Sequence, residues 1–278
     1  MPLGPIEKTT AVKIVREIGT EGSSPLLVLD HEANEYYSKT TSSILPRVEI
    51  INEIFCAYAL DLWNIRVPKP YLINIPYDLV KIFNLEQPKQ ISNRYKENHF
   101  EQAFFGSKSI GNNVSIQDYL IGISRSQLNK IDSPKDIIKI GVFDFWIGNK
   151  DRKPSNPNFL LGAINSQIVV YAIDHTAAFA HLPNYLAVKD IMLRMEPNFS
   201  ILETRLAKDI LSYMNKKEID NLSNEILNDM IKVTDNFDFI VSQIPSEWGF
   251  SKKAKDHIKA FLSDVERNKR IANSFINI

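Results

Sequence analysis

The segment between Trp146 and Phe179 constrains the fold of this chain more than any other part of the sequence. It reads W-I-G-N-K-D-R-K-P-S-N-P-N-F-L-L, continues through a short hairpin, and returns as Y-A-I-D-H-T-A-A-F. Asp151 precedes Asn156 by five residues, and Asp174 ends the returning apolar strand. Metal-assisted phosphoryl transfer needs an acid that orients a hydroxyl group, and oxygen ligands for Mg²⁺. The segment therefore predicts such a site on two adjacent loops.

Several residues around this predicted site leave alternatives open. Asn158 competes with Asn156 as the metal ligand because it directly precedes the strand-like run F-L-L, but the five-residue spacing favours Asn156. Arg152 and Lys153 follow the proposed base, and they either neutralise a transferring phosphate group or extend into solvent as loop charges. His175 is expected to support the site without binding a metal, since no cluster of cysteine and histidine accompanies it.

Phosphoryl transfer also needs a cation and a backbone cradle for the nucleotide phosphates, and both are expected upstream. Lys39 ends the short strand-like run E-Y-Y-S-K. Glu53 on the following helix is its expected partner, with Glu49 one turn earlier as the alternative. The turn I-G-T-E-G-S-S-P supplies N–H groups and hydroxyls for anionic oxygen. The candidate cradle residues in that turn are Gly22, Ser23 and Ser24.

Composition narrows the class of protein without identifying it. The 278 residues suffice for a sizeable core, and 33 basic and 33 acidic residues cancel, which disfavours a nucleic-acid binder. The single cysteine, Cys56, excludes an intrachain disulfide. The first residues lack the basic and apolar regions of a secretory signal, and no apolar run approaches the ~20 residues of a membrane span. We therefore expect a cytoplasmic protein that acts without a membrane.

The pattern along the chain predicts an α+β fold with two lobes: a β-rich N-terminal lobe over 1–110 and a mostly helical C-terminal lobe over 111–278. Strands are expected over 11–17, 25–30, 35–39 and 67–75, with a further strand-and-loop segment over 99–109. Helices are expected over 47–63, 76–83, 137–147, 188–195, 201–215, 217–232, 235–243 and 251–275. Ser133 and Pro134 are expected to start the helix that leads to Asp151.

These motifs, in this order, resemble the HipA-like kinase family, whose members have a protein-kinase-like fold. The D-R-x-x-x-N block followed by I-D-H is the most specific match, and protein kinases place an Asp and an Asn at the same spacing. The resemblance implies that Lys39 contacts ATP, that Asp151 is the catalytic aspartate, and that Asn156 and Asp174 bind Mg²⁺. It also implies that the Phe104–Lys108 segment, with Phe105, Gly106 and Ser107, is a hinge beside the adenine.

The resemblance further implies a Ser/Thr protein kinase that uses ATP and Mg²⁺, with a protein substrate and an antitoxin-like regulatory partner. Lys153 departs from the family, which usually has His at this position. Self-phosphorylation on a serine near the nucleotide would fall on Ser23 or Ser24 by location. The alternatives are a small-molecule or lipid kinase of the same fold, and an adaptor that binds nucleotide without catalysis.

Overall fold

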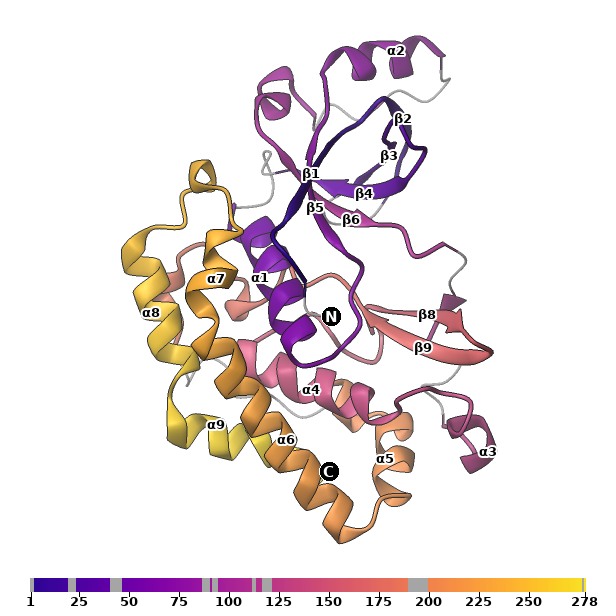
Figure 1. The fold of residues 1–278 in the computed structure, drawn as a ribbon, viewed down its shortest axis with the longest axis vertical. Coiled ribbons are helices and arrows are strands. Elements are labelled where there is room, and N and C mark those ends of the chain that lie inside the picture. Colours follow the sequence, from indigo (N-terminus) through magenta and orange to yellow (C-terminus); the bar gives the residue numbers. More distant parts are fainter. Residues whose placement is uncertain are drawn as a thin grey trace.

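The computed structural model describes residues 3–19, 24–40, 47–86, 91, 95–111, 114–116, 122–189, 200–276 and 278. A sheet built from the first part of the chain lies at one end of the molecule, and helices from the second half fill the other end (Figure 1). The β8–β9 hairpin lies between these two regions at one side (Figure 1). This arrangement confirms the predicted α+β fold with a β-rich N-terminal region and a helical C-terminal region.

The large sheet has six strands in the order β1-β5-β6-β4-β3-β2. Its strands are β1 (Glu7–Thr10), β2 (Lys13–Glu17), β3 (Leu26–Leu29), β4 (Glu35–Lys39), β5 (Pro70–Asn74) and β6 (Phe104–Lys108). All neighbours pair antiparallel except β1 and β5, which run parallel. Lys39 at the end of β4 faces Phe105 of β6 in this register. The sheet therefore brings the predicted lysine beside the predicted hinge segment.

Helix α2 (Asp78–Glu86) packs near this sheet over a separate, smaller core that includes Val28, Ile73 and Phe104. The chain then forms a 3₁₀ turn over Glu97–Glu101 before β6 begins. The expected strand and loop over 99–109 is thus shorter than predicted, and Gly106 lies inside the strand rather than in a loop.

The C-terminal region is mostly helical. Its helices are α3 (Arg125–Leu128), α4 (Lys135–Ile147), α5 (Arg205–Ser212), α6 (Lys216–Asp235), α7 (Phe237–Ser242), α8 (Lys252–Leu262) and α9 (Val265–Ala272). The single helix predicted over 251–275 is two helices, because Asp264 caps α9 by accepting a hydrogen bond from the backbone N–H of Arg267. The helix predicted over 188–195 falls mostly outside the described residues.

Helix α1 (Val48–Leu62) joins the two regions. It is buried on nearly all sides, and its apolar residues belong to the same core as those of α4, α6 and α7. The amide group of Asn52 donates hydrogen bonds to the carbonyls of Thr176 and Ala178, at 2.9 and 3.0 Å. Packing on the C-terminal helices therefore fixes α1, which carries both candidate glutamates, against the segment that follows Asp174.

Helix α4 delivers the chain to the Asp151 loop. The helix begins at Lys135, and the hydroxyl of Ser133 donates to the carboxylate of Asp136 instead of capping the backbone as predicted. It ends at Gly148, whose φ of 68° is the left-handed conformation that favours glycine. Strands β8 (Phe159–Ile164) and β9 (Gln167–Ala172) follow as an antiparallel hairpin, with β7 (Val114–Ser115) beside β8. The hairpin places its two ends, and so the two predicted loops, side by side.

No helix formed by the described residues is both long and apolar enough to cross a membrane.

Candidate active site

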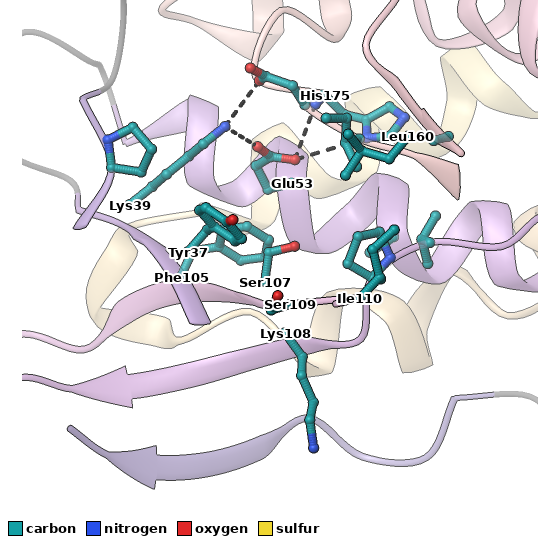
Figure 2. A pocket seen from close by; sticks show the side chains of 17 residues that line it. Tyr37, Lys39, Glu53, Phe105, Ser107, Lys108, Ser109, Ile110, Leu160 and His175 are labelled. Carbon is teal, nitrogen blue, oxygen red and sulfur yellow. Dashed lines mark hydrogen bonds and ion pairs between the residues drawn. The ribbon is translucent and has the colours of Figure 1, made fainter. Parts of the chain in front are cut away.

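A cavity of about 280 Å³ opens between the large sheet and the β8–β9 hairpin. Its apolar lining consists of Pro25, Ala57, Val67, Pro68, Phe105, Ile110, Leu160, Ala172 and Ile173. Its charged lining consists of Lys39, Glu53, Lys108 and Asp174. Figure 2 shows Tyr37 and Phe105 close together on neighbouring strands, with Lys39 extending toward Glu53. An apolar slot beside a charged end suits a molecule with a flat base and an anionic tail.

Lys39 forms two ion pairs in this cavity. Its Nζ lies 2.6 Å from Oε1 of Glu53 and 3.0 Å from Oδ1 of Asp174. Burial alone would lower the pKa of Lys39, but the two carboxylates raise it above its usual value. Burial would likewise raise the pKa of Asp174, but the charge of Lys39 holds it well below its usual range. Lys39 and Asp174 are therefore both charged, which gives the cavity a fixed cation beside a fixed anion.

The two candidate glutamates of α1 have different partners. Glu53 contacts Lys39 and also accepts a hydrogen bond from the backbone N–H of His175, at 3.0 Å. Glu49 instead contacts Nε2 of His181 at 2.6 Å. Burial raises the pKa of both carboxyls. The geometry thus agrees with Glu53 as the partner of Lys39 and assigns Glu49 to a different contact.

Asp151 lies in a tight loop directly after α4. Its backbone N–H donates to Oδ1 of Asn149, at 3.1 Å. Its Oδ2 accepts hydrogen bonds from the side-chain amides of Asn156, at 2.8 Å, and Asn158, at 3.3 Å. The loop is closed by paired backbone hydrogen bonds between Lys153 and Asn156. Both asparagines therefore hold the carboxylate of the predicted base, with Asn156 in the shorter contact.

Arg152 differs from both expectations for it. The side chain is fully buried, and its Nε lies 2.8 Å from Oδ2 of Asp144, a residue of α4. It therefore neither reaches solvent nor faces a substrate phosphate. Burial raises the pKa of Asp144 to about 6 despite the opposing charge of Arg152. Lys153 is partly exposed, so of the two cations that follow Asp151 it is the one that solvent reaches.

Asp174 lies two residues after the end of β9, with Ile173 between them. Its φ of 54° is a left-handed conformation. Lys39 and the hydroxyl of Thr176 both contact its Oδ1, and among the described residues no hydrogen bond reaches its Oδ2. The amide nitrogen of Asn156 donates to Asp151, so its amide oxygen is the atom left to bind a metal ion. A carboxylate and an amide oxygen are donor types that Mg²⁺ accepts, since it takes few protein ligands and completes its shell with phosphates and water. Within the described residues, no group of three or more His, Cys, Asp or Glu side chains is arranged to hold a metal.

Not every predicted nucleotide contact lines the cavity. Phe105 and Ser107 do, whereas Gly106 is not part of the lining. A side chain at Gly106 would point at Ile73, whose Cδ1 lies 2.2 Å from the position of an added Cβ. Ser24 is buried, and its carbonyl accepts a hydrogen bond from the hydroxyl of Tyr95. Gly22 and Ser23 lie outside the described residues.

The structure adds residues that the motifs did not reveal. Tyr37 lines the cavity, and its position two residues before Lys39 on a strand could have indicated this, because alternate residues share a face. Ser109 and Ile110 extend the lining beyond the end of β6. Asp144 and Asn149 hold the Asp151 loop through a hydrogen bond of 2.9 Å between their side chains, and no pattern in the sequence separated them from ordinary buried polar residues.

A β-rich region over a helical region, with a lysine–glutamate pair and an Asp-x4-Asn loop at their junction, defines a kinase-like fold. The comparisons with known proteins agree. The family model described as HipA-like kinase matches residues 11–274, so the chain belongs to the HipA-like kinase family and is a kinase. Among solved structures it is similar to the Helicobacter pylori proinflammatory kinase CtkA, with 11% identity, a TM-score of 0.51 and 99% of each chain covered. No curated protein matches the chain significantly.

Proposed function

We propose that this kinase transfers the γ-phosphate of ATP, in the presence of Mg²⁺, to a serine or threonine hydroxyl of a protein. One observation carries the proposal: Lys39 is held between Glu53 and Asp174 in a cavity whose remaining lining is largely apolar. The apolar part suits the adenine, and the ammonium group suits the α- and β-phosphates. Glu53 keeps that ammonium group in place, since its carboxylate is buried on α1.

Asp151 would orient the acceptor hydroxyl. The two asparagine amides contact the same carboxylate oxygen, Oδ2, so the other oxygen is available to accept a hydrogen bond from a substrate. The two amides also restrict the rotation of the carboxylate, which favours one geometry for the acceptor. Holding a nucleophile in line with the γ-phosphate is the main protein contribution in this reaction.

Asp174 and Asn156 would hold the metal ion through their side-chain oxygens, with ATP phosphates and water as the other ligands. When bound, Mg²⁺ neutralises charge on the phosphates. Lys153 is proposed as a further cation near the transferred phosphate, because the burial of Arg152 removes the other candidate. The His-to-Lys departure from the family would then keep a polar group at this position while adding a permanent charge.

The acceptor class and the partners belong to the same proposal. The zero net charge, which gives no general attraction to polyanions, favours a protein acceptor over a nucleic acid or an anionic membrane lipid. We extend the proposal to a regulatory, antitoxin-like partner, on the strength of the family resemblance, and to a cytoplasmic location, on the strength of the single cysteine. A small-molecule kinase of the same fold is the alternative that the acceptor assay separates.

The test is to incubate the protein with γ-labelled ATP, Mg²⁺ and a cell lysate, and to separate protein from small molecules. Label on proteins supports the proposal, whereas label on small molecules alone assigns the alternative acceptor. Asp151→Asn should lower transfer about 10²- to 10⁴-fold, since it removes a catalytic carboxylate, and should leave nucleotide binding intact. Binding is measured with a fluorescent ATP analogue. Full turnover in Asp151→Asn would refute the role of Asp151.

A further inference from the structure

The buried guanidinium group of Arg152 connects the two catalytic loops. Besides its ion pair with Asp144, its Nη1 donates hydrogen bonds to the carbonyls of Pro157, at 3.1 Å, and Asn158. Its Nη2 donates to the carbonyl of Ile173, at 3.1 Å. These contacts engage all three nitrogen atoms of the side chain. Because the guanidinium is planar and its donors have fixed directions, it sets the distance between the backbones that it binds.

The carbonyls that Arg152 binds belong to the strained parts of both loops. Asn158 has a φ of 48° and Asp174, directly after Ile173, has a φ of 54°. Asn and Asp adopt this left-handed region more readily than other non-glycine residues, yet it is still a sparsely populated conformation that surrounding contacts help to hold. The backbone N–H of Ile173 also donates to the carbonyl of Asn158, at 3.0 Å, which joins the two loops directly. Arg152 therefore holds the backbone on which the orientation of Asp174 depends.

The histidine after Asp174 extends this connection to the Lys39 cluster. Nε2 of His175 lies 2.8 Å from Nη2 of Arg152. Arginine only donates hydrogen bonds, so Nε2 accepts and the ring proton is on Nδ1. The backbone N–H of His175 donates to Glu53, and the contact between these residues is drawn in Figure 2.

A second set of hydrogen bonds connects Asp144 to Asp151. Oδ1 of Asp144 accepts a hydrogen bond from the side chain of Asn149, whose own oxygen accepts from the backbone N–H of Asp151. Asp144 therefore holds Asp151 through Asn149, and holds the Asp174 loop through Arg152. Both sets of contacts begin at Asp144 on α4, and the packing of α4 in the core fixes the position of Asp144.

We propose that Arg152 and His175 are positioning residues that fix Asp174 and Glu53 relative to Asp151 for phosphoryl transfer. His175 borders the nucleotide cavity, but its Nε2 is bound to Arg152, and both side chains act through the residues that they hold. The inference rests on the proposed function, because it assigns the metal to Asp174 and the acceptor to Asp151. A residue that orients a metal ligand typically changes metal affinity or activity about 10- to 100-fold when it is removed.

The decisive variants are His175→Leu and His175→Gln. Leucine removes the acceptor for Arg152, whereas the side-chain oxygen of glutamine can take the place of Nε2. Arg267→Lys is the matched control, because Arg267 is likewise a buried arginine that donates to a backbone carbonyl, that of Trp146 on α4. For each variant we would measure the melting temperature, kcat, the KM for ATP, and the Mg²⁺ concentration that gives half-maximal binding of a fluorescent ATP analogue.

We expect His175→Leu to lower kcat about 10- to 100-fold and to raise the Mg²⁺ requirement, while His175→Gln recovers most of both. Arg267→Lys should lower the melting temperature without changing kcat or the Mg²⁺ requirement. The inference is overturned if His175→Leu keeps the wild-type values, or if its activity falls only in proportion to its unfolded fraction. If the wild-type protein transfers phosphate to no acceptor, the proposed function fails, and the Mg²⁺ requirement for analogue binding then decides the inference separately.

Discussion

The ammonium nitrogen of Lys39 lies 3.0 Å from Oδ1 of Asp174, although 135 residues separate them in the sequence. Lys39 lies on the large sheet and Asp174 on the loop after β9, so this ion pair connects the N-terminal and C-terminal regions of the chain. Glu53 adds a third charge from α1. Because α1 packs on the C-terminal helices, the shared core fixes the helix that carries Glu53 to the lysine.

The two glutamates of α1 give a first prediction. Glu53→Gln should lower kcat/KM for ATP at least about 10-fold, because it removes a charged partner that orients Lys39. Glu49→Gln should leave kcat/KM within about threefold, since Glu49 contacts His181 and not Lys39. Steady-state kinetics with varied ATP measure both. Equal losses in the two variants would contradict the assignment of Glu53.

Asn156 and Asn158 give a second prediction, which separates the two candidate metal ligands. Asn156→Ala should raise the Mg²⁺ concentration for half-maximal activity about 10-fold or more, because it removes a ligand atom. Asn158→Gly should change it little, since glycine accepts the left-handed backbone of Asn158 and keeps the carbonyl that Arg152 binds. Mg²⁺ titrations at saturating ATP measure this concentration. A larger increase in Asn158→Gly than in Asn156→Ala would assign the metal ligand to Asn158 instead.

Where local pattern determined an element, the sequence predicted it well. The run E-Y-Y-S-K forms β4 over the predicted residues, and α1 begins and ends within one residue of the predicted helix. Strand β1 was missed because E-K-T-T is polar and mostly exposed, so only its pairing with β5 makes it a strand. The break before α9 was missed although Asp264 is a cap residue, since the apolar spacing continues through it.

In the candidate site, too, the sequence predicted what local spacing determines and missed what tertiary contacts determine. The spacing of Asp151, Asn156 and Asp174 along the chain could be read directly, and the structure brings the two loops together. What the sequence left undecided was the direction of side chains: Arg152 carries a charge in a turn-rich loop, where solvent exposure is the usual outcome. Its burial depends on Asp144, one helix turn and a loop away, and on carbonyls beyond the loop. Contacts of this kind are set by the tertiary fold alone.

Gly106 gives a third prediction, because it lies in the expected hinge and yet faces away from the cavity lining. Gly106→Ala should destabilise the protein by about 1–3 kcal/mol, since the added methyl group would overlap the buried side chain of Ile73. The dissociation constant of a fluorescent ATP analogue should stay unchanged. Gly162→Ala on β8 is the matched control, because its Cβ would meet its nearest neighbour at 3.1 Å and the cost should be smaller. Weakened binding with unchanged stability would instead place Gly106 in the nucleotide site.

The lowered pKa of Asp174 gives a last prediction, on stability against pH. A carboxyl whose pKa is lower in the folded state stabilises the fold fully above its unfolded value, here 3.8, and loses that contribution as the pH falls toward the folded value. Asp174→Asn should therefore cost about 1 kcal/mol at pH 6, the range of a partly exposed ion pair. The difference between the two proteins should shrink at pH 3, where the carboxyl of the unfolded wild-type chain takes up a proton while that of the folded protein stays ionised. Urea unfolding of both proteins at pH 6, 4 and 3 measures this difference, and other ionisable groups largely cancel because both chains share them. A cost that stays constant down to pH 3 would show that Asp174 stabilises the fold through its shape and hydrogen bonds and not through its charge beside Lys39.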